Sequence, residues 1–274
     1  MRIWGIDIIK SFIRMADDGC QQGWHERNGG NLTYRMKSSE VEQCRPFFKT
    51  PGDWTAMGVN ASNLAGEYFI TTGSGKYFRN IILEPENNIG IVEINKSGDS
   101  WRIVWGLENN AVPTSEFPSH YMSHSVRTIA TNGANRVIYH AHVPYLISLT
   151  YILPLTARDF TRTLWQSATE CPVVFPMGVG VLPWMVPGGT EIALMTAEKM
   201  KTYDAVVWAH HGLFCSGLNF DTAYGLMYTI EKAAQIHSLA LAAGHGHILQ
   251  TITDDNLRAI AKAFCVNINE KFLD

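Results

Sequence analysis

The sequence of 274 residues has little charge and no long apolar run. Charged residues make up 17% of the chain, the net charge is −3, and no stretch is dense in lysine or arginine. Proteins that hold nucleic acid by its phosphates need basic surfaces, so we expect no nucleic-acid partner. A membrane-spanning helix needs about 18 or more consecutive apolar residues, so we expect no membrane partner either.

Cysteine is also scarce. The five cysteines are an odd number, lie far apart in the sequence and form no Cys-x-x-Cys motif. This pattern argues against a disulfide framework and a cysteine-based zinc site, and it favours a reducing compartment. Residues 1–10 carry charges where the apolar segment of a signal peptide would lie. We therefore expect the protein to be cytoplasmic.

Hydrophobic residues make up 46% of the chain, which is enough for a sizeable core. Helical and strand-like patterns mix without a linker or a repeat of about 20–50 residues, so we expect one α/β domain over residues 1–274. Residues 37–66 are expected to form an irregular surface segment. The patterns predict helices at 6–22, 114–132, 144–153, 159–169, 190–202, 221–243 and 255–265, and strands at 32–36, 68–70, 89–94, 101–105, 136–142, 179–182 and 205–209.

The most informative stretch is Arg136-Val-Ile-Tyr-His140-Ala-His142, an apolar run that ends in two histidines. Side chains alternate across a strand, so His140 and His142 are expected to point to one face. A zinc ion takes about four ligands, and a rigid strand end can hold two of them. The alternative is that both histidines are packed or hydrogen-bonded parts of the core.

A second buried run, Ala205-Val-Val-Trp-Ala209, ends in His210-His211-Gly212 and offers a third ligand. Catalytic zinc sites typically use three protein ligands. Only one of the adjacent histidines can face the first two. We choose His211, which precedes a flexible glycine, and expect His210 to point into packing or to a partner group.

Two other histidine pairs are weaker candidates for a metal site. His120 and His124 lie four residues apart in a predicted helix, but they lack the glutamate of the His-Glu-x-x-His motif. His245 and His247 alternate with glycines near the C-terminus, in a segment that we expect to be mobile.

Two glycine-rich segments could bind an anion through exposed N–H groups. In Asn28-Gly-Gly-Asn31 the glycines need a turn, and a plain β-turn is the simpler explanation. The segment Thr71-Thr-Gly-Ser-Gly-Lys76 follows a strand, but it is not a P-loop because Lys76 is followed by Tyr77.

Pro113-Thr-Ser-Glu116 precedes an amphipathic helix. We expect Thr114 or Ser115 to cap this helix, and their hydroxyls could also contact a phosphate at its N-terminus. By local pattern alone, Glu116 is an ordinary surface charge that complements the helix dipole.

In this order along the chain, these segments resemble the class II aldolase/adducin family. The resemblance extends from about Gly23 to the last predicted helix. It rests on Asn28-Gly-Gly-Asn31-Leu, Thr72-Gly-Ser-Gly75-Lys, Pro113-Thr-Ser-Glu116, His140-Ala-His142 and His211-Gly212. It implies a central, mostly antiparallel β-sheet with helices on both sides, assembled as a homotetramer with active sites near the subunit interfaces.

The resemblance also implies roles for individual residues. The family's zinc ligands correspond to His140, His142 and His211, and its catalytic carboxylate corresponds to Glu116, which replaces the surface role. A proton donor from a neighbouring subunit corresponds to Glu170. The groups that bind the substrate phosphate correspond to Asn28, Asn31, Gly73, Ser74, Gly75, Thr114 and Ser115.

Within the family, the chain length and the segment Leu182-Pro-Trp-Met-Val-Pro-Gly resemble the L-rhamnulose-1-phosphate aldolase branch. That branch cleaves L-rhamnulose 1-phosphate reversibly to dihydroxyacetone phosphate and L-lactaldehyde, and Zn²⁺ stabilises the enediolate charge. One alternative is a sibling aldolase or epimerase that acts on fuculose 1-phosphate or ribulose 5-phosphate. Another is a non-catalytic, adducin-like interaction domain, and the three histidines together with Glu116 argue against it.

Overall fold

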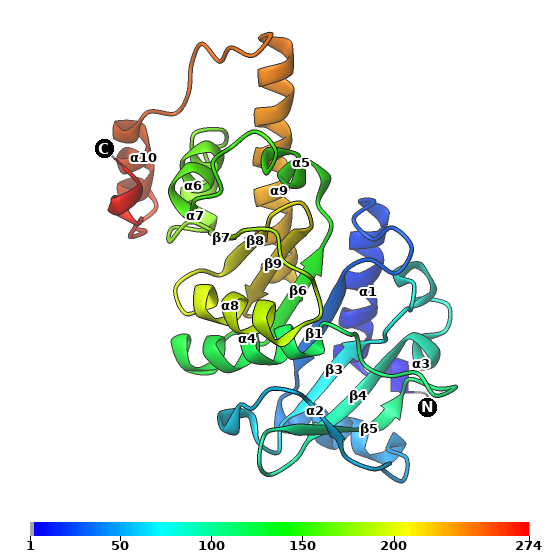
Figure 1. Cartoon of the computed structure of the whole chain (residues 1–274). Helices are drawn as coiled ribbons and strands as arrows, with labels where there is room; N and C mark the ends of the chain where they lie inside the picture. The colour runs from blue at the N-terminus through cyan, green and yellow to red at the C-terminus, as the bar shows by residue number, and fades with distance from the viewer. Residues whose placement is uncertain (1–2, 274) are drawn as a thin grey trace.

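The computed structural model describes residues 3–273 (Figure 1). Five helices begin and end within a few residues of their predicted bounds, because their apolar residues recur at helical spacing. Among residues 3–273, no helix combines the length and the apolar character that a membrane span requires. The helices are α1 (Asp7–Gln21), α2 (Ser38–Cys44), α3 (Pro85–Asn88), α4 (Phe117–Ala130), α5 (Pro144–Leu149), α6 (Ala157–Trp165), α7 (Cys171–Val174), α8 (Thr190–Met200), α9 (Phe220–Ala243) and α10 (Asp254–Ala263), with short 3-10 turns at Ile3–Gly5, Arg45–Phe47, Ser62–Leu64, Phe78–Asn80 and Glu270–Phe272.

A nine-stranded sheet in the order β2-β5-β4-β3-β1-β6-β9-β8-β7 connects the two halves of the chain. Neighbouring strands are antiparallel throughout, except that β7 and β8 are parallel. Helices pack against both faces, so the predicted fold class is confirmed (Figure 1). The strands are β1 (Asn31–Arg35), β2 (Thr55–Ala56), β3 (Tyr68–Thr72), β4 (Ile89–Ile94), β5 (Ser100–Gly106), β6 (Val137–Ala141), β7 (Gly180–Leu182), β8 (Ala205–Trp208) and β9 (Gly212–Gly217).

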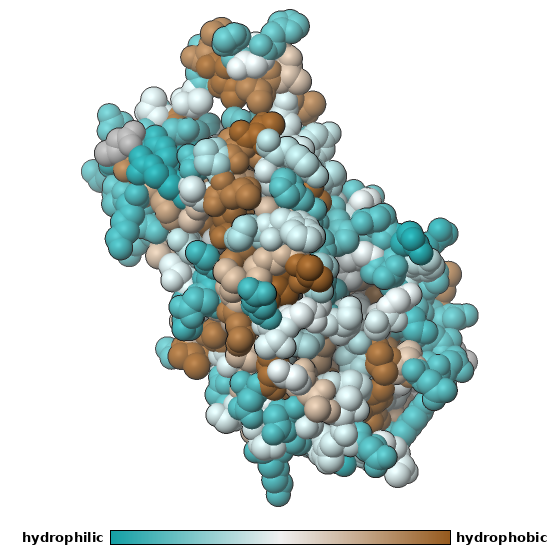
Figure 2. Space-filling view, in the orientation of Figure 1, coloured by the Kyte–Doolittle hydropathy of each residue, from teal (hydrophilic) through white to brown (hydrophobic). Residues whose placement is uncertain are grey.

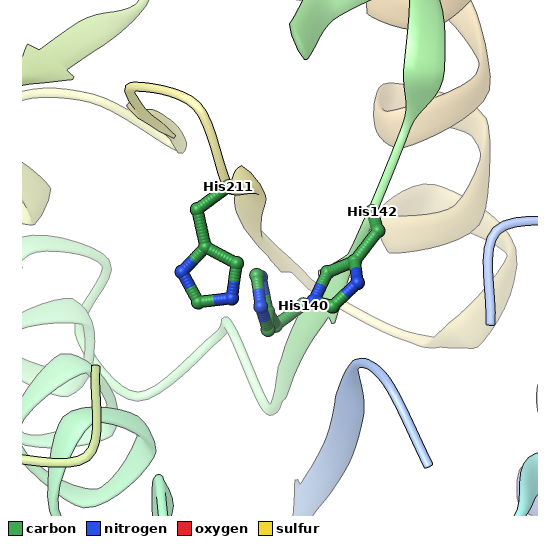
Figure 3. A group of neighbouring side chains, drawn as sticks. All are labelled: His140, His142 and His211. Carbon is green, nitrogen blue, oxygen red and sulfur yellow. The ribbon is translucent and has the colours of Figure 1, made fainter. Parts of the chain in front are cut away.

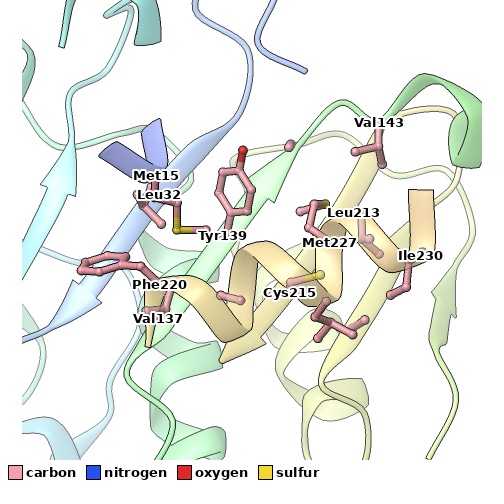
Figure 4. Packing of buried hydrophobic residues seen from close by; sticks show 14 of the residues in the cluster. Met15, Leu32, Val137, Tyr139, Val143, Leu213, Cys215, Phe220, Met227 and Ile230 are labelled. Carbon is pink, nitrogen blue, oxygen red and sulfur yellow. The ribbon is translucent and has the colours of Figure 1, made fainter. Parts of the chain in front are cut away.

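The central strand β6 separates two apolar cores, because its side chains alternate between the faces of the sheet. Val137, Tyr139 and Ala141 join the large core formed with α1 and α9 (Figure 4). Ile138 joins a smaller core with α8 on the opposite face. His140 belongs by alternation to the α8 face, where it is completely buried.

Residues 37–66 correct the expectation of an irregular surface segment. They contain α2 and also β2, which pairs with β5 at the edge of the sheet. Four apolar residues of this segment are buried against Phe69 and Tyr121 in a separate core, namely Met57, Val59, Ala61 and Leu64. Glycine, asparagine and serine separate these residues, so no helical or strand periodicity showed that they were buried. This core supports the N-terminal half of α4.

Strand β9 is the element near the histidines that the sequence pattern did not predict. It follows β8 through a tight turn in which His211 N–H donates to the Trp208 carbonyl (3.1 Å). At the tip, His210 has a φ of 60°, a left-handed conformation that is uncommon without glycine. The turn therefore lacks the usual sequence signal of a hairpin. Because β9 pairs with β6, this hairpin brings His211 to the end of the strand that carries His140.

Candidate active site

Three histidine rings meet at the end of β6 (Figure 3). His140 lies on β6, His142 follows it directly, and His211 lies in the turn between β8 and β9. One possible ligand atom from each ring lies within 4.8 Å of the others. A single metal ion between them could contact all three rings after small side-chain adjustments, since zinc–nitrogen distances are about 2.0–2.1 Å.

The surroundings of His140 leave one ring nitrogen bare. Its Nδ1 donates to the Leu213 carbonyl (3.1 Å), so the neutral ring keeps an unprotonated Nε2. Burial lowers the pKa of His140 well below its ordinary value, which keeps the ring neutral. Within residues 3–273 this buried Nε2 has no hydrogen-bond partner. A buried acceptor without a donor is what a metal ion would satisfy.

His142 is held by the loop between α1 and β1. Its Nδ1 donates to Glu26 Oε1 (2.5 Å), and its backbone N–H donates to the Trp24 carbonyl (3.1 Å). A carboxylate on one ring nitrogen fixes the tautomer and makes the other nitrogen a better metal ligand. A Cβ at Gly29 would lie only 2.8 Å from His142 Nδ1, so the glycine has a role beyond the turn. No sequence signal linked Glu26 to His142, because the two are 116 residues apart.

Of the adjacent histidines, the structure places His211 in the cluster and turns His210 away. His210 Nδ1 lies 3.1 Å from Thr150 Oγ1, and its ring packs on Tyr151. Burial and the nearby His142 lower the pKa of His211 to about 4, so its ring is neutral at pH 7 and can act as a ligand.

The two rival histidine pairs do not form such a cluster in the described residues. His245 and His247 are exposed beyond the end of α9. His120 and His124 are buried on α4, and both rings hydrogen-bond to Thr33 Oγ1, at 2.8 and 2.9 Å.

Glu116 is a buried carboxylate and not a surface charge. Its Oε2 lies 3.6 Å from His140 Nε2 and accepts a hydrogen bond from Asn31 Nδ2 (3.0 Å). Burial raises the pKa of Glu116, although the Asn31 bond and the nearby His142 act in the opposite direction. A carboxyl with a raised pKa beside a metal cluster is suited to exchange protons with a substrate.

The predicted cap of α4 is displaced by one or two residues. The helix begins at Phe117, so Glu116 and not Thr114 or Ser115 occupies the N-cap position. Thr114 Oγ1 instead accepts a hydrogen bond from the Glu116 backbone N–H (3.3 Å). The Thr114 side chain therefore holds the backbone of Glu116, the candidate catalytic residue.

The glycine-rich segment 71–76 and the segment 113–116 before α4 lie side by side. Gly73 and Pro113 form an isolated β-bridge, and Thr114 N–H donates to the Thr72 carbonyl (2.9 Å). Within residues 3–273 the exposed hydroxyls of Ser74 and Ser115 have no hydrogen-bond partner, so both can meet an anion.

Strand β1 links these segments to the histidines. Leu32 N–H donates to Thr72 Oγ1 (3.2 Å), next to the glycine-rich segment. Asn31 is paired in register with His140 on β6. The exposed Asn28 lies just before β1, in the loop that holds His142.

Two predicted site residues, Asn31 and Glu170, do not lie where their predicted roles would place them. The side chain of Asn31 is buried and already bonded to Glu116 and His120. Glu170 is exposed at the start of α7, and among residues 3–273 its side chain makes no hydrogen bond or ion pair. It is therefore not part of the histidine cluster within one chain.

The fold and this geometry define an α/β protein whose cluster of three histidines, which could hold a metal ion, and buried carboxylate lie at the end of a central strand. The chain belongs to the class II aldolase and adducin family, since the family described as Class II Aldolase and Adducin N-terminal domain matches residues 10–238.

Relatives cover nearly the whole chain. The rhamnulose-1-phosphate aldolase of Klebsiella pneumoniae subsp. pneumoniae is 45% identical over 266 residues, which are 97% of this chain and 96% of that protein. The protein of the same name from Listeria monocytogenes serotype 4a is 40% identical over 269 residues, 97% of this chain and 96% of the relative.

Solved structures agree on the fold. A sugar-phosphate aldolase from Thermotoga maritima has a TM-score of 0.69 at 26% identity, covering 87% of this chain and 96% of that one. An L-fuculose 1-phosphate aldolase superposes with a TM-score of 0.60 at 21% identity, covering 94% and 96%, and supports the fold alone.

Proposed function

We propose that this protein is a zinc-dependent aldolase that cleaves L-rhamnulose 1-phosphate reversibly to dihydroxyacetone phosphate and L-lactaldehyde. The observation that carries the proposal is the buried Glu116 carboxylate, 3.6 Å from the unpartnered Nε2 of His140 in the histidine cluster. The substrate is suggested by relatives at 40–45% identity that are named rhamnulose-1-phosphate aldolase.

His140, His142 and His211 would hold the metal ion. Three neutral imidazoles suit zinc, which uses three protein ligands and keeps a further position for substrate in catalytic sites. A bound zinc ion would supply Lewis-acid stabilisation of the negative charge that develops on the substrate's oxygens. Glu26 would keep the His142 ring in the tautomer that a ligand needs.

Glu116 would move the proton during bond cleavage and formation. Breaking the C–C bond beside the ketone leaves an enediolate, which takes up a proton at carbon to become dihydroxyacetone phosphate. In the cleavage direction, a carboxylate takes the proton from the substrate hydroxyl whose carbon becomes the aldehyde. It then returns a proton to the carbon of the enediolate. The raised pKa of Glu116 brings its two protonation states closer in free energy near neutral pH.

The substrate phosphate would bind between the glycine-rich segment and the segment before α4. Both segments lie side by side, and β1 joins them to the metal cluster. Binding energy from a remote phosphate positions the reacting carbons. The proposed phosphate-binding residues are Asn28, Gly73, Ser74, Gly75, Thr114 and Ser115. The side-chain amide of Asn31 is already hydrogen-bonded to Glu116, so we propose that Asn31 positions this carboxylate and does not bind the phosphate.

Glu170 would act on the aldehyde in the active site of a neighbouring copy, within a homotetramer. Its exposure leaves it available to another chain. Apolar side chains are also exposed near the site, including Trp184 and Val186 (62% and 70%), and their loop lies beside Ser115. Figure 2 shows brown, apolar side chains gathered along the middle of one face and over α9. Such surfaces commonly mark protein interfaces.

The decisive experiment is a coupled assay of dihydroxyacetone phosphate release over a panel of ketose 1-phosphates. We expect L-rhamnulose 1-phosphate to give the highest kcat/KM. We expect Glu116→Gln to lose about 10²–10⁴-fold, the usual contribution of general acid–base catalysis. Glu191→Gln, an exposed substitution on α8, is the matched control.

Three results would change the proposal. A better substrate such as fuculose 1-phosphate would move the protein to a sibling activity. Full activity of Glu116→Gln would remove Glu116 from proton transfer. Absence of both bound metal and activity would indicate an adducin-like interaction domain.

A further inference from the structure

Glu116 is the first member of a buried chain of hydrogen bonds that ends inside the protein. Asn31 Nδ2 donates to Glu116 Oε2 (3.0 Å), and Asn31 Oδ1 is hydrogen-bonded to His120 Nε2. Thr33 Oγ1 then lies 2.8 Å from His120 Nδ1 and 2.9 Å from His124 Nε2. All five side chains are buried, and none of the last three belongs to the histidine cluster.

The two elements that meet here supply these residues by their own periodicities. Glu116, His120 and His124 lie four residues apart at the start of α4, on one face of the helix. Asn31 and Thr33 are alternate residues of β1 and share the face of the sheet on which α4 packs. The chain of hydrogen bonds is therefore a feature of the α4–β1 interface.

The chemistry of the groups fixes the direction of every bond. An ionised carboxylate can only accept, so the Asn31 NH₂ group faces Glu116 and its Oδ1 faces His120. His120 must then carry its proton on Nε2. Burial lowers the pKa of His120 to about 3, although the Ile138 backbone acts in the opposite direction, so the ring is neutral and Nδ1 carries no proton. The Thr33 hydroxyl therefore donates to His120 Nδ1.

The same matching of donors to acceptors sets the last hydrogen bond, between Thr33 and His124. With its proton given to His120, Thr33 Oγ1 accepts from His124, which must carry its proton on Nε2. Within residues 3–273 the remaining Nδ1 of His124 is buried without a partner. If every donor and acceptor were exchanged, Asn31 Oδ1 would face the Glu116 carboxylate, so two acceptors would meet. The N–H on His124 Nδ1 would also be buried without an acceptor, which costs more free energy than a buried lone pair without a donor.

We propose that Asn31, His120, Thr33 and His124 form a directional relay that positions Glu116, holding Oε2 as a permanent acceptor so that Oε1 exchanges the proton with the substrate. The proposal rests on the proposed function, which makes Glu116 the proton carrier. The four residues are positioning residues. Because the Asn31 amide is bonded on both sides, it cannot rotate, and the plane of the Glu116 carboxylate is fixed with it.

An interface built only for packing has no need of this arrangement. Apolar side chains of similar volume would fill the space between α4 and β1 without burying two imidazoles and a hydroxyl. The polar chain is aligned toward one atom, Glu116 Oε2. The cost of burying it is offset if it sets the geometry of the reacting carboxylate.

Thr33 allows a clean test because two residues, His120 and Asn31, and three hydrogen bonds separate it from Glu116. Thr33→Val keeps the branched shape and removes the hydroxyl, whereas Thr33→Ser keeps the hydroxyl and removes a methyl group. The readout is deuterium incorporation at the carbon next to the carbonyl of dihydroxyacetone phosphate in D₂O, followed by NMR. This partial reaction needs no aldehyde, so it does not depend on which sugar is the substrate.

We expect Thr33→Val to lower kcat of deuterium exchange about tenfold, a part of the ~10²–10⁴-fold typical of acid–base catalysis, with KM and zinc content unchanged. Thr33→Ser should stay within about twofold of the wild type. A packing role gives the opposite order, because only Thr33→Ser creates a cavity. In a Glu116→Gln background, Thr33→Val should cost nothing further, since the positioned group is gone.

The outcomes separate the two hypotheses. Wild-type exchange by Thr33→Val, or equal losses in both Thr33 variants, would overturn the relay and leave the proposed function intact. A wild-type protein that exchanges no deuterium overturns the proposed function, and the relay with it. If Thr33→Val does not fold, Asn31→Asp removes the donor to Glu116 while keeping the shape, and wild-type exchange by that variant overturns the relay equally.

Discussion

At the scale of single residues, two different partners orient rings of the histidine cluster that we propose to hold the metal. The Leu213 carbonyl binds Nδ1 of His140, and the Glu26 carboxylate binds Nδ1 of His142. Both rings therefore keep Nε2 for the cluster. The carboxylate also places a negative charge behind the His142 ring, which the carbonyl behind His140 does not.

The first prediction concerns His142. We expect His142→Ala to lose stoichiometric zinc and at least roughly 10³-fold in kcat/KM, because two imidazoles hold a catalytic zinc ion poorly. Metal content by atomic absorption and the coupled cleavage assay check this. His210→Ala is the matched control, since His210 is bonded to Thr150 outside the cluster. Equal zinc in both variants would contradict the assignment.

Residue-level prediction from sequence succeeded where the signal is local and failed where it is not. His140 and His142 could be recognised as one pair because strand alternation is a short-range rule. Glu116 looked like a surface charge, since its burial depends on Asn31 and on packing that joins α4 to β1. Glu26 had no signal at all, because it meets His142 only after the sheet has formed.

At the scale of elements, amphipathic helices were the easiest to predict. The bounds of α1 (Asp7–Gln21) and α10 (Asp254–Ala263) differ little from those expected, because one apolar face marks each turn. Strand β9 was missed because its turn uses a left-handed histidine in place of glycine. The core residues of segment 37–66 were missed because loops bury apolar side chains without periodicity.

A second buried carboxyl, from α9, lies against the start of α5, which begins two residues after His142. Glu231 on α9 accepts hydrogen bonds from the backbone N–H groups of Tyr145 and Leu146, each at 2.9 Å. Burial raises the pKa of Glu231 from 4.5 to about 7, although these two bonds act in the opposite direction. The folded protein therefore binds a proton here between about pH 4.5 and 7 that the unfolded chain has lost.

The second prediction follows from the sign of this shift. Since the native state holds more protons in that window, the contribution of Glu231 to stability is present below pH 4.5 and is lost as pH rises through 7. Relative to Glu231→Gln, the wild type should lose up to about 3 kcal/mol of unfolding free energy over that range. Urea unfolding of both proteins from pH 5 to 8 measures the difference. If the wild type instead gained unfolding free energy relative to Glu231→Gln as pH rose, the α5 amides would be stabilising the charged carboxylate.

At the scale of the whole molecule, one chain does not bring all the proposed groups together. Glu170 stands exposed at the start of α7, away from the histidine cluster. Exposed apolar side chains border the site on two sides: Tyr151 packs on His210, and the loop with Trp184 passes beside Ser115. A neighbouring copy that covers these side chains would also bring a carboxylate to the substrate.

The third prediction tests this exchange between chains. Glu116→Gln and Glu170→Gln should each be nearly inactive alone. When the two variants are coexpressed with different tags and the hybrids purified, random assembly should restore about a quarter of wild-type activity, because that share of sites pairs an intact Glu116 with an intact neighbouring Glu170.

The matched control for these hybrids is coexpression of Glu116→Gln with His142→Ala. Glu116 and His142 belong to the same site of the same chain, so no hybrid of these two variants contains an intact site. Equal inactivity of both kinds of hybrid would show that Glu170 does not serve a neighbouring copy. Restored activity in the first hybrid alone requires a proton donor supplied across an interface, and it makes assembly of the chain a condition of its catalysis.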